Sequence, residues 1–149
     1  MKNIPSLFAL MLLLATSAHA QEERMGNFEI QRMRSAFNQA ETLSSNLKGL
    51  SLVTVPTDYP NAVGKAAWAR QSKWIDDVRS RVDRYRASLA TVLQDSVVTS
   101  SEGKAMNTQC SQILVRDPDA ATMAGPMLNR YRTVTSWCNA LCTNENITE

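Results

Sequence analysis

The sequence predicts an all-α protein, an elongated helical bundle of about four helices with one long helix near residues 61–96. Apolar residues recur every three or four positions over long stretches, which is the period of an amphipathic helix. Helix-capping residues stand at the ends of these stretches. The chain has only five glycines, and a strand-like pattern is confined to residues 50–55, so a β-sandwich or barrel is not expected.

The first 20 residues match a cleavable export signal. Lys2 precedes an apolar run over residues 7–15, and Ala18-His19-Ala20 has the small residues that flank a cleavage site. A run of this length is too short to cross a hydrocarbon layer of roughly 30 Å; an uncleaved anchor is the less favoured alternative. We therefore expect a single helical domain over residues 21–149, exported to the periplasm or secreted, with a frayed C-terminal tail and no transmembrane segment.

The first helix of the bundle is expected over residues 22–49. Its apolar positions are Ile30, Met33, Phe37, Ala40, Leu43, Leu47 and Leu50. Gly49 is suited to end it. Residues 50–60 contain two prolines and form a connection, in which Leu52 and Val55 are apolar enough to lie partly against the bundle.

The longest helix is expected over residues 61–96, with Asn61 as its cap. Its apolar residues form a seam with heptad-like spacing. They are Trp68, Ile75, Val78, Val82, Tyr85, Leu89 and Val92. The opposite face is rich in arginine and aspartate, which can pair at four-residue spacing. A helix of this length spans roughly 50 Å, which predicts an elongated molecule.

Two further helices complete the predicted bundle. Thr99 and Glu102 match a capping box that begins a helix running to about Arg116. Asp117-Pro118-Asp119 matches a second helix start, and this helix should run to about Cys142. Gly125-Pro126 should kink or restart it.

Charge and histidine content exclude several functional classes. Removal of the signal would leave 15 Lys and Arg against 14 Asp and Glu, a balance that is not typical of a nucleic-acid-binding protein. The single histidine, His19, belongs to the signal. The mature chain would then lack a histidine base, histidine metal ligands and a haem-attachment motif. We expect a protein that is not an enzyme and that has no cofactor and no metal site.

The chain has three cysteines, Cys110, Cys138 and Cys142, and two of them should pair in an oxidising compartment. Cys138 and Cys142 are one helical turn apart, a spacing that strains a disulfide. The predicted bond therefore joins Cys110 to one of these two. The apolar seam favours Cys138, although a straight hairpin turning near Asp117 would keep it far from Cys110. The remaining cysteine could pair between molecules.

A repeated tetrapeptide and a tryptophan supply candidate binding residues. Asp83-Arg84-Tyr85-Arg86 is echoed by Asn129-Arg130-Tyr131-Arg132. If the two helices pack together, four guanidinium groups could surround two tyrosines and bind a phosphate or a carboxylate. We favour the simpler interpretation, in which the arginines extend to water along the edges of the seam. Trp74 lies at a seam edge, where it could anchor an interface or form half-buried core.

Two functional hypotheses remain. The leading one is a non-enzymatic interaction or accessory module of the cell envelope or a secretion apparatus, with a protein partner or self-association through a long helical surface. It predicts an exposed apolar patch. The alternative is a bundle that binds a small apolar or anionic ligand. It predicts a pocket of at least roughly 300 Å³ lined by Trp68, Tyr85, Tyr131 or methionines.

Overall fold

The computed structural model describes residues 23–57, 59 and 62–144. The predicted export signal, the predicted cap at Asn61 and the last residues of the predicted tail lie outside this part of the chain. The structure consists of α2 (Asn27–Ser51), α3 (Ala62–Leu93), α4 (Ser100–Ser111), the short 3₁₀ helix η1 (Ala120–Thr122) and α5 (Gly125–Asn144).

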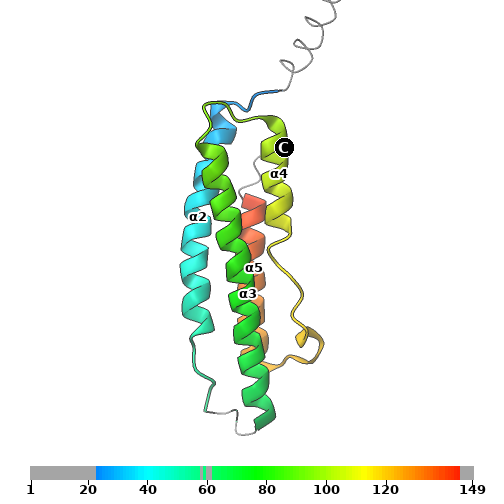
Figure 1. Ribbon diagram of the computed structural model, residues 1–149. Helices are drawn as coiled ribbons and strands as arrows, with labels where there is room; N and C mark the ends of the chain where they lie inside the picture. The colour runs from blue at the N-terminus through cyan, green and yellow to red at the C-terminus, as the bar shows by residue number, and fades with distance from the viewer. Residues whose placement is uncertain (1–22, 58, 60–61, 145–149) are drawn as a thin grey trace, which may run out of the picture.

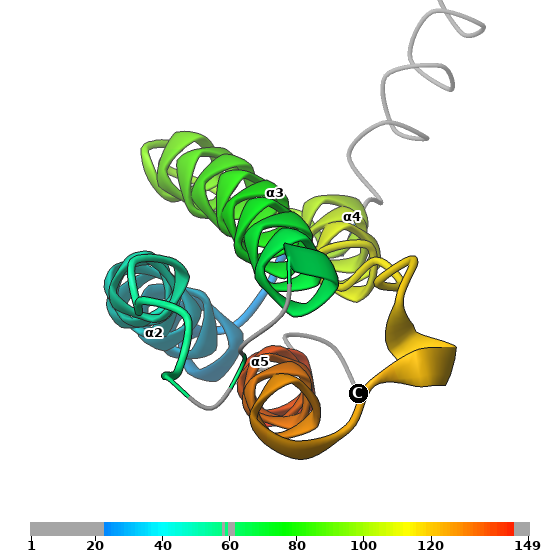
Figure 2. The same cartoon turned by 90° about the horizontal axis from the view of Figure 1, so that it is seen from below.

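The four α-helices form an up-and-down bundle (Figure 1). Seen along its length, α2 and α4 lie on opposite sides of α3, and α5 completes the group (Figure 2). The described residues contain no strand, so the prediction of an all-α bundle is confirmed. We call the end at which α2 ends and α3 begins the lower end, as in Figure 1.

The core lies between the four helices, with α4 contributing Met106 and Cys110, and the predicted seam of α3 is confirmed. Its seven apolar residues, from Trp68 to Val92, are each at most 9% exposed. They pack mainly against α2, which contributes Met33, Ala36, Ala40, Leu43 and Leu47. Because burial of one large aliphatic or aromatic side chain contributes about 1.5–3 kcal/mol, this seam contributes substantially to the stability of the bundle.

The end of α2 differs from the prediction. Gly49 lies inside the helix and does not cap it, because α2 continues to Ser51. The N–H of Leu52 closes the helix by donating to the carbonyl of Lys48 at 3.3 Å, so no left-handed residue is needed there. The side chain of Leu52, which was expected to lie partly against the bundle, is 70% exposed.

The start of α4 agrees with the prediction and its end does not. The Thr99 side chain accepts from the N–H of Glu102, and the Glu102 carboxylate accepts from the N–H of Thr99 at 3.2 Å, which is a capping box. The helix stops at Ser111, whereas it was expected to reach about Arg116. The indole N–H of Trp74 donates to the carbonyl of Val115 at 2.9 Å and holds the chain beyond α4 in a non-helical path.

The predicted helix start at Asp117 produces only the single turn η1. The Asp117 carboxylate accepts from the N–H of Asp119, two residues further on, at 2.9 Å. Such a local bond competes with helix formation. The long fourth helix begins instead at Gly125, whose φ of +57° is readily adopted only by glycine. The predicted restart at Gly125-Pro126 is therefore confirmed.

Because α4 is short, it covers only the upper part of the bundle. The linker over residues 112–124 closes the same side of the lower part (Figure 1). Irregular backbone carries polar groups that helices would satisfy internally, so it requires side-chain partners. This linker therefore gives the lower part a more polar interior than the upper part.

The disulfide joins Cys110 to Cys142, with the two Cα atoms 5.7 Å apart. The preference for Cys138 drawn from the apolar seam was wrong. Cys138 is a free thiol that is 2% exposed within the core, and its burial raises its pKa to about 11. The bond to Cys142 is possible because the linker descends before α5 rises, which brings the last turn of α5 beside the end of α4.

Candidate functional site

Buried polar side chains are concentrated in the lower part of the bundle. In the part of the chain that the structure describes, four polar residues are buried. Three of them, Gln71, Asp117 and Arg130, lie around the first turns of α3, the linker and the start of α5. A polar group taken out of water destabilises the fold unless it gains a bonding partner, so such a concentration marks a candidate functional site.

Arg130 is buried although its bonding partners are neutral. Its Nη2 donates to the carbonyl of Leu50 and to the hydroxyl of Ser72, both at 2.8 Å. Its guanidinium carbon lies 4.0 Å from the centre of the Trp68 ring, a cation–π contact. Desolvation lowers the pKa of Arg130 to about 10, an effect that the charge of Asp76 opposes. The group therefore remains charged at neutral pH, where it faces the negative end of the α2 dipole.

Trp68 holds the next residues of the same segment. Its indole N–H donates to the carbonyl of Val53 at 3.0 Å. Arg130 and Trp68 thus hold backbone carbonyls at the end of α2 and in the loop after it. Gln71 joins them to α5 by donating to the carbonyl of Met127 at 2.9 Å. We call these residues with Ser72 the clamp; its members are Trp68, Gln71, Ser72 and Arg130.

The clamp fixes the backbone of residues 50–53 and leaves two apolar side chains in water. Leu52 is 70% exposed and Val53 is 48% exposed. The clamp bonds to this segment through backbone carbonyls, so the side chains contribute nothing to that attachment. The result is an apolar projection, made of Leu52 and Val53, on a segment that is held in place from beneath.

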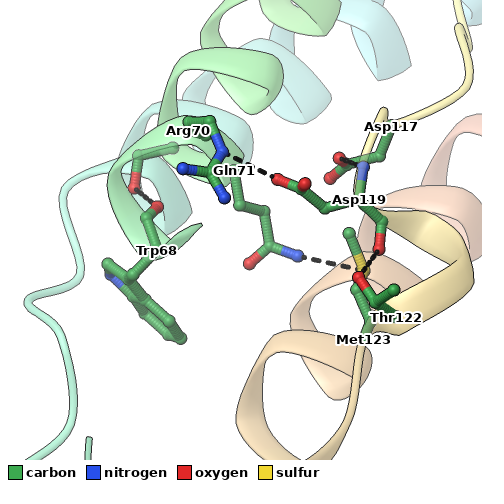
Figure 3. A network of polar contacts seen from close by, with 8 residues as sticks. Trp68, Arg70, Gln71, Asp117, Asp119, Thr122 and Met123 are labelled. Atoms are coloured by element: carbon green, nitrogen blue, oxygen red, sulfur yellow. Dashed lines mark hydrogen bonds and ion pairs between the residues drawn. The ribbon is translucent and has the colours of Figure 1, made fainter. Parts of the chain in front are cut away.

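A pocket of about 350 Å³ lies on another side of the lower end, between α3, η1 and the start of α5. Its lining residues include Tyr59, Ala67, Arg70, Asp119, Met123 and Met127. Arg70 Nε and Asp119 Oδ2 form an ion pair at 3.1 Å (Figure 3). The Tyr59 hydroxyl donates to the carbonyl of Ala124 at 3.3 Å. The pocket therefore combines an apolar lining with one ion pair.

Asp117 lies next to Asp119 on the same segment (Figure 3) and is 1% exposed. One carboxylate oxygen accepts from the N–H of Asp119, and the other is buried without a hydrogen-bond partner. Desolvation raises the pKa of Asp117, and the charge of Asp119 raises it further. The backbone hydrogen bond and the charge of Arg70 act in the opposite direction.

The binding residues proposed from the sequence have different surroundings. Trp74, expected at a seam edge, is 5% exposed, and its ring lies 5.5 Å from that of Tyr131. Arg130 does not extend to water as expected; it is 4% exposed in the clamp. The remaining candidates are Tyr85, buried in the core, Arg86, 3.8 Å from Glu41, and the exposed Arg84 and Arg132.

Sequence reasoning missed Gln71, Ser72 and Asp117 as members of the site. One signal was present, because the predicted seam of α3 has a seven-residue gap between Trp68 and Ile75. Gln71 occupies the position that fills this gap, and it is fully buried. A polar residue on an apolar seam needs a partner from another element, and here that partner is the backbone of α5.

No helix in the described part of the chain is long and apolar enough to cross a membrane. The same residues contain no cluster of three or more His, Cys, Asp or Glu side chains that could hold a metal ion. Comparison with protein families, curated proteins and solved structures finds no match. Function must therefore be inferred from the geometry of the lower end.

Proposed function

We propose that the protein is an exported, non-enzymatic interaction module that docks on a protein partner through Leu52 and Val53. The observation that supports this most directly is the clamp, which fixes the backbone of residues 50–53 while both side chains stay exposed. A segment that is already ordered loses little conformational entropy on binding. Two apolar side chains on such a segment are suited to fill an apolar depression on a partner.

The distribution of exposed apolar residues supports docking through an end of the bundle. Among the described residues, the large apolar side chains that are exposed are Phe28, Leu52, Val53 and Val97. Leu52 and Val53 are at the lower end, and Phe28 and Val97 are at the upper end (Figure 1). We accordingly place the contact at an end loop and not on the long helical surface that the sequence suggested.

The burial of Arg130 also fits this role. Burying a guanidinium group that forms no ion pair costs desolvation energy. An apolar residue at the same position often gives the fold equal stability. An apolar residue could not, however, donate to the carbonyls of Leu50 and Ser51. We infer that Arg130 serves to position the backbone of this segment.

Two features support export to the periplasm or secretion. The first 20 residues have the pattern of a cleavable signal. The Cys110–Cys142 disulfide is of a kind that persists in oxidising compartments. A role other than catalysis is supported by the lack of histidine after His19, since histidine is the most frequent general base in enzymes.

Cross-linking in the periplasm of the native host tests the docking proposal. The variant Leu52→Ser/Val53→Ser alters the proposed surface, and Phe28→Ser/Val97→Ser is the matched control at the upper end. All these side chains are exposed, so thermal unfolding should stay within a few degrees of wild type in both variants. A specific partner should be cross-linked to the wild type and the control, and lost from the Leu52/Val53 variant. Retention of the same proteins by all three forms would refute the proposal.

Binding of a small ligand is a second candidate function, supported by the pocket beside Arg70. Its volume of about 350 Å³ exceeds the roughly 300 Å³ of the smaller ligand sites in proteins. Met123 and Met127 line it, as expected for such a site, whereas Trp68, Tyr85 and Tyr131 are not among its lining residues.

A further inference from the structure

We propose that the pocket beside Arg70 and Asp119 binds an organic cation, namely an ammonium or guanidinium group carried on an apolar chain. This site is separate from the Leu52/Val53 projection and does not depend on the docking role proposed for it. The sequence suggested an apolar or anionic ligand instead. The surroundings of the pocket favour the opposite charge.

The lining of the pocket suits an apolar chain. Met123 and Met127 provide flexible, polarisable side chains, which adapt well to aliphatic groups. Ala67 and Ala124 add small apolar surfaces. A cavity of about 350 Å³ has room for an aliphatic chain of several carbon atoms.

The charges around the pocket favour a cation. Arg70 and Asp119 are the charged members of its lining, and Asp117 adds a second carboxylate close enough to interact electrostatically with both. The charged groups in and beside the pocket are therefore two carboxylates and one guanidinium. A cation would be attracted by both carboxylates, whereas an anion at Arg70 would be repelled by both.

The ion pair can open to admit a ligand. The Arg70 side chain is 58% exposed and that of Asp119 is 26% exposed, and ion pairs between exposed side chains are weak. Arg70 can therefore move into water while Asp119, which is more enclosed, accepts from the incoming group. An ionised carboxylate can accept several hydrogen bonds at once.

Tyr59 adds an aromatic ring to the pocket lining. Its hydroxyl is bonded to the carbonyl of Ala124, and its ring centre lies 6.1 Å from that of Trp68. These contacts hold the ring in place at the pocket. A positively charged group near an aromatic face gains about 0.5–2 kcal/mol, which adds to the preference for a cation.

Two sources could supply this chemistry: a free alkylamine, or a lysine or arginine side chain of a protein. The test uses the mature chain with ¹³C-labelled methionine methyl groups, observed by NMR during titration with pentylammonium. Met123 and Met127 line the pocket, whereas Met33 and Met106 lie in the core and report any general disturbance. Pentanoate and pentanol serve as an anionic and a neutral probe with the same chain.

We expect pentylammonium to shift the methyl signals of Met123 and Met127 saturably, to leave those of Met33 and Met106 in place, and to bind more tightly than either other probe. An acetylated, amidated lysine tripeptide then separates the sources. Tighter binding of the tripeptide indicates a protein side chain, and tighter binding of pentylammonium indicates a free amine.

Two variants with opposite expected effects make the test specific. Asp119→Asn removes the carboxylate and should weaken pentylammonium binding about two- to fivefold, the range of an exposed ion pair. Arg70→Gln removes the competing cation and should strengthen binding by a similar factor. The N–H of residue 119 still bonds to Asp117 in the first variant. The side chain replaced in the second variant is 58% exposed, so both proteins should fold.

Other outcomes would overturn the inference. No saturable shift at Met123 and Met127, tighter binding of pentanoate, or weaker binding in Arg70→Gln would each exclude a cation site. The Leu52→Ser/Val53→Ser variant should bind pentylammonium as the wild type does. The docking proposal can therefore fail while this one stands, and the reverse is also possible.

Discussion

Gln71 occupies a seam position of α3 at which the helical pattern calls for an apolar side chain, and Arg130 is buried beside the apolar residues of α5. Each lies within three residues of a buried apolar neighbour on its own helix, Met127 for Arg130 and Trp68 for Gln71. Both donate to backbone carbonyls of other elements, which satisfies most of their polar groups, although Arg130 Nε is buried without a hydrogen-bond partner. At the scale of the residue, the lower part of the bundle is thus specified by directional bonds as well as by apolar burial.

Burial of the Asp117 carboxylate destabilises the fold, and the raised pKa of this group predicts how that effect depends on pH. Burial raises the pKa of Asp117 above the usual 3.8, so the folded state favours the protonated form. Its ionisation therefore destabilises the fold at neutral pH, and this effect disappears as the pH falls below the usual pKa. Asp117→Asn removes this charge and should therefore raise the free energy of unfolding at pH 7, although the asparagine amide would occupy the same unpartnered position as the carboxylate oxygen that it replaces.

Urea unfolding of the wild type and Asp117→Asn at pH 7 and at pH 3 checks this expectation. Asparagine can still accept from the N–H of residue 119 through its side-chain oxygen, so the local turn should persist. The stability difference should shrink toward zero at the lower pH, because both side chains are then neutral. A difference that is the same at both pH values would show that the charge of Asp117 is not its cause.

At the scale of the element, local patterns predicted most of the structure. The apolar seam of α3, the capping box at Thr99 and the restart at Gly125 depend on residues close in sequence, and all are confirmed. The early end of α4 was not predictable in this way. It depends on the bond of Trp74 to Val115, 41 residues away, and no short window of sequence contains both partners.

The candidate site could not be predicted from the sequence for the same reason, because its contacts join residues that are far apart in the chain. The clamp joins residues from α2, α3 and α5, and the contact from Arg130 to Leu50 spans 80 residues. In the sequence, the tetrapeptide that contains Arg130 is distinguished only by its resemblance to the one around Tyr85. Its importance in the structure comes instead from the position of one arginine against Trp68 and the end of α2.

Two glycines allow a test of the element boundaries. Gly49 lies within α2, where a methyl group would meet no atom within 4 Å. Gly49→Ala should therefore stabilise the protein by about 0.5–1 kcal/mol, since alanine favours helix over glycine. Gly125 begins α5 with φ at +57°, a conformation unfavourable to residues with a β-carbon, so Gly125→Ala should destabilise it by about 1–2 kcal/mol.

Thermal and urea unfolding of the two alanine variants measure these effects against the wild type. The free energy of unfolding should therefore rise in Gly49→Ala and fall in Gly125→Ala. If Gly49 ended α2, as the sequence suggested, Gly49→Ala would be destabilising as well. Equal effects at both sites would contradict the helix boundaries described for α2 and α5.

At the scale of the whole molecule, the Cys110–Cys142 disulfide encloses the linker and the start of α5 in one loop. The two cysteines are 32 residues apart in sequence. Met123, Asp119 and Arg130, which contribute to the pocket and the clamp, lie inside this loop. Closing a loop of this length should stabilise the fold by about 3.5 kcal/mol in the chain-entropy description.

Replacement of both bonded cysteines by serine should therefore lower the free energy of unfolding by about 3–4 kcal/mol, measured by urea unfolding. Cys138→Ala is the control, because it removes a buried cysteine side chain without breaking the disulfide. It should lower the free energy of unfolding by about 1 kcal/mol. The thiol of Cys138 is buried and its pKa is raised to about 11, so it should resist a thiol reagent in the folded protein. In the wild type, one thiol should react, and only after denaturation. Reaction of the folded protein, or reaction of three thiols after denaturation, would contradict the assigned disulfide.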